Sequence, residues 1–129
     1  KMREILFRAW DKTENKYKKF EGMHDTMTIS REGKVEYYNL QNGSGFDEYI
    51  LEQFTGLTDK NGNKIFEGDV IHVDDYDEGW NSTVEFNGGA FAVDVEGKDY
   101  DYTAIGWLEY EVEVIGNIHD NPELLEAKS

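Results

Sequence analysis

The chain has 129 residues, including 3 Trp, 8 Tyr and 7 Phe, and it has no cysteine. This length is that of one ordinary domain, and so many aromatic residues exclude a disordered chain. The absence of cysteine excludes disulfides, thiolate zinc sites and a cysteine nucleophile. No apolar run approaches the roughly 20 residues that span a bilayer, and no signal peptide opens the chain, so we expect a soluble, cytoplasmic protein.

The net charge of −15 belongs entirely to the second half of the chain. Residues 1–64 hold 11 basic and 11 acidic side chains, whereas residues 65–129 hold 2 basic and 17 acidic ones. Such a field repels phosphate backbones and anionic membrane surfaces. We therefore expect no direct nucleic-acid binding and no membrane binding. The acidic surface serves either a basic protein partner or solubility alone.

Short apolar and aromatic runs predict strands in the first half of the chain. A glycine-rich stretch at Asn42–Gly45 predicts a flexible connection, and Gly56 is expected to end the strand before it. The predicted strands are Glu4–Trp10, Lys16–Phe20, Lys34–Leu40 and Tyr49–Phe54.

The second half shows clearer turn and strand signals. Asp59–Asn63 (DKNGN) predicts a turn in which Gly62 can supply a positive φ, and Asn87–Gly89 predicts a hairpin turn. Asn121, Pro122 and Glu123 predict the start of a short C-terminal helical turn. Predicted strands are Val70–Val73, Thr83–Phe86, Ala90–Val95 and Glu111–Ile115, the last with Val112 and Val114 on one face.

The residues Asp74, Asp75, Asp77 and Glu78 place four carboxylates within five positions. Hard cations need several oxygen ligands, so calcium or magnesium is one interpretation of this loop. The loop does not match the EF-hand spacing, and a solvated hairpin loop that discourages edge pairing is the interpretation we favour. We predict no metal site and no cofactor.

No pattern of catalytic residues recommends an enzyme. The three histidines lie far apart in the sequence, and His72 within its apolar strand predicts a structural residue with a hydrogen-bond partner. The serines show no nucleophile elbow, and Gly43–Gly45 is too short for a phosphate loop. We predict no catalytic residues, and a metal-dependent enzyme using the 74–78 loop is the remaining enzymatic alternative.

Acidic residues also alternate with aromatic ones further along the chain, at Asp99–Tyr102 and then at Trp107 and Tyr110. Exposed aromatics bounded by carboxylates suit a basic protein partner, whereas alternate burial would make the same aromatics part of the core. The candidate partner-binding residues form a charged rim around an aromatic anchor: Asp74, Asp75, Asp77, Glu78, Trp80, Asp99 and Asp101.

Three segments together resemble the YopX family, small proteins of phages and prophages of Gram-positive bacteria: Met2–Asp11 (MREILFRAWD), Gln53–Val70 (QFTGLTDKNGNKIFEGDV) and Val114–Leu125 (VIGNIHDNPELL). The resemblance implies a mainly β fold whose C-terminal part is similar to a small SH3-like barrel. It implies a phage or prophage setting, and it offers no catalytic or ligand-binding residues, because the family's function is unknown.

Together these observations predict a mainly β protein in which an N-terminal β portion, residues 1–58, packs on a C-terminal acidic SH3-like barrel, residues 59–129, around one shared core. The leading functional interpretation is a non-enzymatic protein-interaction module in the bacterial host, bound to a basic host or phage protein. The alternatives are an acidic DNA mimic that inhibits a host DNA-binding protein, and a homo-oligomeric structural or assembly component.

Overall fold

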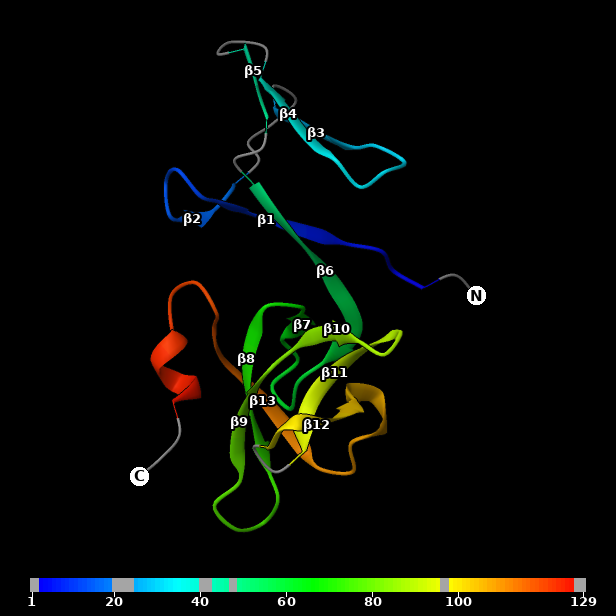
Figure 1. The fold of residues 1–129 in the computed structure, drawn as a ribbon, viewed down its shortest axis with the longest axis vertical. Coiled ribbons are helices and arrows are strands. Elements are labelled where there is room, and N and C mark those ends of the chain that lie inside the picture. Colours follow the sequence, from blue (N-terminus) through cyan, green and yellow to red (C-terminus); the bar gives the residue numbers. More distant parts are fainter. Residues whose placement is uncertain (1–2, 20–24, 40–42, 47–48, 96–97, 127–129) are drawn as a thin grey trace. The chain divides into compact units, whose positions relative to one another are not determined.

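The computed structural model describes residues 3–19, 25–39, 43–46, 49–95 and 98–126 (Figure 1). Strands make up 55% of the structure and short 3-10 helices 7%, which confirms the mainly β prediction. The chain forms two compact units, Phe7–Glu52 on the one hand and Lys1–Leu6 with Gln53–Ser129 on the other. The boundary between residues 58 and 59, the shared core and the SH3-like form stay predictions.

The smaller unit consists of short antiparallel strands. One group has the order β2-β1-β6, and a second sheet has the order β3-β4-β5. The strands are β1 (Phe7–Asp11), β2 (Lys16–Tyr17), β3 (Asp25–Ile29), β4 (Val35–Asn39), β5 (Gly43–Phe46) and the first part of β6 (Tyr49–Thr58).

A buried carboxylate organises the smaller unit. Glu52 is 3% exposed, and it accepts hydrogen bonds of 2.8 Å from Arg8 Nε and 2.8 Å from the Tyr17 hydroxyl. The Arg8 guanidinium also lies 4.3 Å from the centre of the Tyr17 ring, and Trp10 meets that ring edge-on. The charge of Glu52 is thus compensated inside the unit, as burial of a carboxylate requires.

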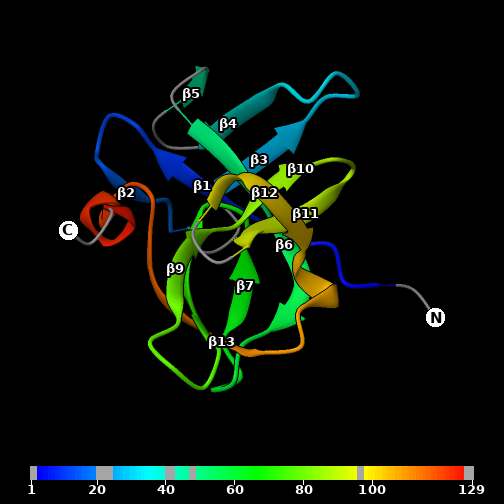
Figure 2. The same cartoon turned by 60° about the horizontal axis from the view of Figure 1, so that its bottom comes forward.

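The larger unit contains the second part of β6, paired with β7, and two three-stranded sheets of order β13-β8-β9 and β10-β11-β12. Figure 2 shows these sheets curling around the interior of the unit. The elements are β7 (Lys64–Phe66), β8 (Asp69–Asp74), β9 (Trp80–Thr83), β10 (Glu85–Asn87), β11 (Ala90–Val95), β12 (Lys98–Ala104), η2 (Ile105–Trp107), β13 (Glu111–Asn117) and η3 (Pro122–Leu125).

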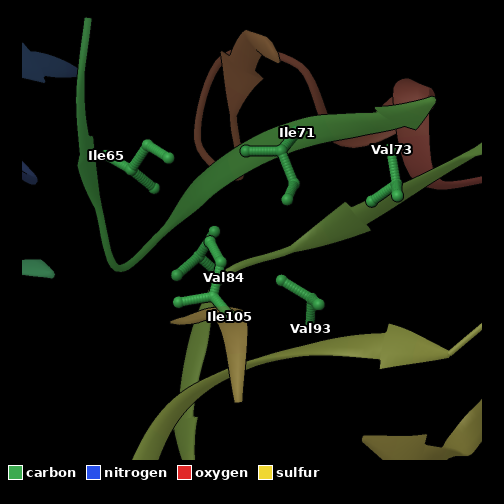
Figure 3. Packing of buried hydrophobic residues seen from close by; sticks show 6 residues of the cluster. All are labelled: Ile65, Ile71, Val73, Val84, Val93 and Ile105. Carbon is green, nitrogen blue, oxygen red and sulfur yellow. The ribbon is translucent and has the colours of Figure 1, made fainter. Parts of the chain in front are cut away.

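The core of the larger unit is a cluster of aliphatic side chains that point toward one another (Figure 3). Val112 and Val114 of β13 pack against it from one face of their strand, as the alternation of the sequence predicted. Burial of each aliphatic side chain contributes about 1.5–3 kcal/mol. The cluster residues are Ile65, Ile71, Val73, Val84, Val93 and Ile105.

The turn signals are confirmed where glycine supplies a positive φ. Asn87 pairs with Ala90 across a two-residue turn in which Gly88 and Gly89 have φ of 64° and 83°. This is the geometry of a type I′ hairpin, which matches the twist of the strands. Gly62 has a φ of 84° in the 59–63 turn, also as predicted.

Two expectations about glycine are wrong. Gly56 does not end its strand, because β6 continues to Thr58 and passes Gly56 at a φ of 90°, where the register with β7 shifts. The Asn42–Gly45 stretch is not a flexible connection over its described part, because Gly43–Phe46 forms β5 against β4. In both places pairing with a neighbouring strand, β7 on either side of Gly56 and β4 along β5, continues the strand where the glycines themselves do not predict one.

The remaining differences concern short strands. The first strand begins at Phe7 rather than Glu4, and β3, β7 and β12 were not predicted. The predicted strand Thr83–Phe86 is divided at Val84 between β9, which begins earlier at Trp80, and β10. The C-terminal turn at Pro122–Leu125 is confirmed as a 3-10 helix. The Asn121 side chain does not cap it; Asn121 Oδ1 instead accepts a hydrogen bond of 3.2 Å from the Asn117 amide.

A second buried carboxylate, Asp59, joins the 59–63 turn to β13. Asp59 is 6% exposed, and its Oδ1 accepts hydrogen bonds from the amides of Asn61 (2.9 Å) and Asn63 (2.8 Å). Its Oδ2 accepts a hydrogen bond of 2.9 Å from the Val114 amide, 55 positions away in the sequence. The Lys60 amide donates to the Val112 carbonyl at 3.0 Å, so the turn covers the outer edge of β13.

The pKa of Asp59 lies below its ordinary value, although two causes oppose each other. Burial raises the pKa, because it disfavours the charged form. The hydrogen bonds from the amides of Val114, Asn63 and Asn61, with a further one from the Asn63 side chain, outweigh burial and favour the carboxylate. Asp59 is therefore ionised in the folded protein at pH values where the unfolded chain already takes up a proton.

We expect Asp59→Asn to lower the free energy of unfolding by about 1–3 kcal/mol. Asparagine has an NH₂ group in place of one carboxylate oxygen, so at least one backbone amide that donates to Asp59 loses its acceptor. Urea denaturation at pH 7 measures the change. The matched control is Asp77→Asn, an exposed carboxylate, which should change stability by less than about 0.5 kcal/mol. Equal losses in both variants would contradict the structural role of Asp59.

The stability difference between the wild-type protein and Asp59→Asn should depend on pH. Because the pKa of Asp59 is lower in the folded protein, its contribution is fully present above the unfolded-state value of about 3.9 and is lost as the pH falls through the folded value. Urea denaturation in steps from about pH 6 to about pH 3 should show the two proteins converging. A constant difference over that range would contradict the assignment.

Candidate functional site

The acidic loop connects β8 to β9, and its own carboxylates hold its shape. Asp74 Oδ1 accepts a hydrogen bond of 3.0 Å from the Tyr76 amide. Asp75 Oδ1 accepts two, from the amides of Asp77 (3.0 Å) and Gly79 (2.9 Å). Gly79 has a φ of 69°, and a side chain there would collide with the Val73 carbonyl oxygen. Hydrogen bonds within the loop therefore fix its conformation, and Asp77 and Glu78 remain exposed at its tip.

The calcium or magnesium interpretation finds no geometric support in the described part of the chain. Within it, no three histidine or carboxylate side chains gather around a point where a metal ion would fit. Asp75 Oδ1 already accepts two amides, so this oxygen is engaged in the turn.

Trp80, the predicted aromatic anchor, is half-buried. Its indole ring packs against the aliphatic core, and its Nε1 donates a hydrogen bond of 3.0 Å to the Asp94 carbonyl. Trp80 therefore fixes the start of β9 to β11, and it presents only part of its ring to solvent.

Two tyrosines beside Trp80 are the exposed aromatics of this region. Tyr76 is 82% exposed at the centre of the acidic loop, and Tyr110 is 41% exposed just before β13. The Tyr110 ring meets both neighbours edge-on, with ring centres 6.2 Å from Tyr76 and 6.1 Å from Trp80. The fold thus joins aromatic residues thirty or more positions apart, Tyr110 on the one hand and Tyr76 and Trp80 on the other, into one aromatic row.

The aromatic row is surrounded by carboxylates. Glu109 and Glu111 flank Tyr110 and are exposed, and the backbone register places Glu111 directly opposite Asp74. Like charges in such cross-strand positions destabilise a sheet. We call this surface the acidic aromatic face: Asp74, Asp75, Tyr76, Asp77, Glu78, Trp80, Glu109, Tyr110 and Glu111.

None of the six carboxylates of the acidic aromatic face forms an ion pair with another described residue. Ion pairs of the larger unit lie elsewhere, as between Lys60 and Glu113 at 3.7 Å and between Lys64 and Glu4 at 3.0 Å. No basic side chain of the described residues thus neutralises the charge of this face.

The structure unites part of the predicted rim. Asp74, Asp75, Asp77, Glu78 and Trp80 lie together, whereas Asp99 and Asp101 belong to β12 with side chains outside the described part of the chain. The site prediction did not include Tyr76, Glu109, Tyr110 or Glu111. Their acidic and aromatic composition was visible, but their position beside the loop follows only from the pairing of β13 with β8.

His72 has the hydrogen-bond partner that the sequence predicted. Its Nδ1 lies 2.8 Å from Asn81 Oδ1, and Asn81 Nδ2 donates a hydrogen bond of 2.9 Å to the Leu124 carbonyl of η3. This chain of contacts ties the C-terminal turn to β9. Among the described residues, no helix is long and apolar enough to cross a membrane.

Solved structures show the same fold. A crystal structure of the protein yopX from Bacillus subtilis is similar with a TM-score of 0.69 and 28% identity, covering 97% of this chain and 100% of that chain. A crystal structure of a protein from Enterococcus faecalis is similar with a TM-score of 0.59 and 29% identity, with the same coverage of both chains.

Sequence comparison gives a consistent result. An uncharacterised protein YopX derived from the SPbeta prophage of Bacillus subtilis (strain 168) is 42% identical over 71 residues. That match covers 51% of this chain and 53% of the relative, about half the length of each. The family model described as YopX protein matches residues 6–126. The chain therefore belongs to the YopX protein family.

Proposed function

We propose that this chain is a phage- or prophage-encoded, non-enzymatic interaction module that acts in the cytoplasm of a bacterial host and binds a basic surface of a host or phage protein. The observation that supports the proposal is the acidic aromatic face, where exposed tyrosines lie among six carboxylates without ion-pair partners in the described part of the chain. The prophage origin of a relative supports the setting.

The chemistry of this face suits arginine and lysine side chains. A guanidinium group can bind a carboxylate through two hydrogen bonds and can also stack on a tyrosine ring. Tyr76 and Tyr110 supply rigid contact area at the centre, and the carboxylates supply long-range attraction at the rim. The net charge of −15 strengthens the attraction of a basic partner at low ionic strength.

Neutralising the exposed rim should weaken partner binding. We expect the triple variant Asp77→Asn, Glu78→Gln, Glu109→Gln to capture less basic protein from a nuclease-treated Bacillus subtilis lysate than the wild-type protein does. Quantitative mass spectrometry of the captured proteins at about 50 mM and about 500 mM salt measures the effect, since screening should weaken wild-type capture too.

The control for this capture is Glu14→Gln, Glu32→Gln, Glu126→Gln, which removes the same charge from exposed positions elsewhere. It should capture what the wild-type protein captures. Identical capture by wild-type and rim variant would contradict the proposal. If the wild-type protein selectively captures DNA-binding proteins and the rim variant does not, the result supports the alternative in which the chain is a DNA mimic that inhibits a DNA-binding protein.

Removing the exposed ring of Tyr76 should weaken the binding of a basic partner without unfolding the protein. Tyr76→Ala should raise the dissociation constant for a captured partner by about 30-fold, the typical cost of truncating an aromatic at the centre of an interface. Its melting temperature should change little, because the ring is 82% exposed. Titration calorimetry checks the affinity, with Phe86→Ala, also exposed, as the aromatic control. Equal losses in both variants would contradict a central role for Tyr76.

A further inference from the structure

Several strands of this fold are prevented from pairing with an additional strand at their edges. The 59–63 turn covers β13 through the Lys60 amide and Asp59 Oδ2. Strand β9 is joined to β11, because Ser82 Oγ accepts a hydrogen bond of 2.9 Å from the Asp94 amide. Strand β12 is interrupted by a register shift opposite Asp94 and Val95. Natural proteins use such covers and bulges to prevent sheets from extending at their edges.

Strand β3 of the smaller unit differs from these edges. It lies at the end of the order β3-β4-β5, and it pairs with β4 over five residues without a register shift. Its sequence, Asp25–Ile29 (DTMTI), contains no lysine and no proline, and its one charged residue, Asp25, stands at its first position, so residues 26–29 carry none of the residues that commonly protect an edge. Within the described residues, β4 is its one sheet neighbour.

The adjoining hairpin shows which backbone groups of β3 face away from β4. The Ser30 amide donates a hydrogen bond of 2.9 Å to the Lys34 carbonyl, so Ser30 points its backbone toward the neighbouring strand. Hydrogen-bonded and non-bonded positions alternate along an antiparallel pair. Thr28 and Thr26 therefore also point inward, and the amides and carbonyls of Met27 and Ile29 point outward.

We propose that β3 pairs antiparallel with β3 of a second copy of this chain, around a two-fold axis at Thr28. In this register Met27 lies opposite Ile29 of the second copy, and the reverse pair forms on the other side of the axis. Both residues point their backbones outward, so the two pairs form four hydrogen bonds. The two sheets then become one continuous six-stranded sheet.

The side chains favour a second copy because the register is self-complementary. Thr28 meets Thr28 of the second copy, Thr26 meets Ser30, and the apolar Met27 meets the apolar Ile29, all favourable cross-strand combinations. Residues 1–64 also carry equal numbers of acidic and basic side chains, so this half does not add to the repulsion between copies.

The association should be weak and should strengthen with salt. A pair of five-residue strands is far smaller than a standard stable interface. Two chains of net charge −15 repel each other, and added salt screens that repulsion. This dependence is opposite to that of the acidic aromatic face with a basic partner, so failure of one proposal is distinguishable from failure of the other.

The test is sedimentation equilibrium of the full chain from about 20 μM to about 1 mM, at low and high salt. We expect a monomer–dimer equilibrium that shifts toward the dimer at high salt. Met27→Pro removes one outward amide per chain, and with it two of the four hydrogen bonds, and should weaken the dimer by about tenfold or more. Proline is tolerated at such edge positions, and circular dichroism confirms that the variant folds.

The position of the two-fold axis has its own test. Thr28→Lys and Thr28→Glu each place like charges opposite one another and should each weaken the homodimer by about fivefold. An equimolar mixture of the two variants should recover dimerisation as a heterodimer, which native mass spectrometry identifies by mass. The same substitutions at Thr13, an exposed turn residue, should leave dimerisation unchanged.

A wild-type protein that stays monomeric at about 1 mM and high salt would overturn the proposal. A dimer that is unaffected by Met27→Pro, or that the mixed Thr28 variants do not restore, would overturn the assignment to β3. The rim variant Asp77→Asn, Glu78→Gln, Glu109→Gln should dimerise at least as well as the wild-type protein, because its net charge is smaller.

Discussion

The position of β13 in the larger unit depends on the hydrogen bond from the Val114 amide to Asp59 Oδ2. This hydrogen bond joins a turn to a strand 55 positions later, and it holds β13 in place beside β8. The register of that pair places Glu111 opposite Asp74 and brings Tyr110 against Tyr76 and Trp80. A carboxylate that would be costly to bury alone is stabilised because several amides solvate it in place of water.

The same contact has a second consequence for association. By covering the outer edge of β13, the 59–63 turn removes a site where another strand could add to the larger unit. The acidic surface of that unit adds repulsion between copies, because residues 65–129 carry the whole net charge. Strand β3 has neither protection, so the two proposals assign different kinds of partner to the two units: a basic protein surface to the larger unit and a β-strand of a second copy to the smaller one.

Sequence patterns predicted the parts of the fold that depend on local chemistry. Val70–Val73 and Glu111–Ile115 were recognisable from β-branched residues and alternation, and the Gly62 and Gly88–Gly89 turns from the need for positive φ. β5 was missed because its glycines carry no strand signal. The burial of Glu52 and Asp59 was missed because Arg8, which pairs with Glu52, and Val114, which covers Asp59, lie far from them in the sequence. The loop carboxylates of the candidate site were likewise evident, whereas Tyr110 joins them only through long-range strand pairing.

The central claim is that the acidic aromatic face binds basic protein surfaces. Its most direct test is an NMR titration of the isotope-labelled full chain with an arginine-rich peptide, with an equally long glutamate-rich peptide as the reference. The account predicts that shift changes on addition of the arginine-rich peptide concentrate in residues 74–80 and 109–111 and are absent with the glutamate-rich one. Changes spread evenly over all acidic residues, or concentrated in residues 7–52, would contradict it.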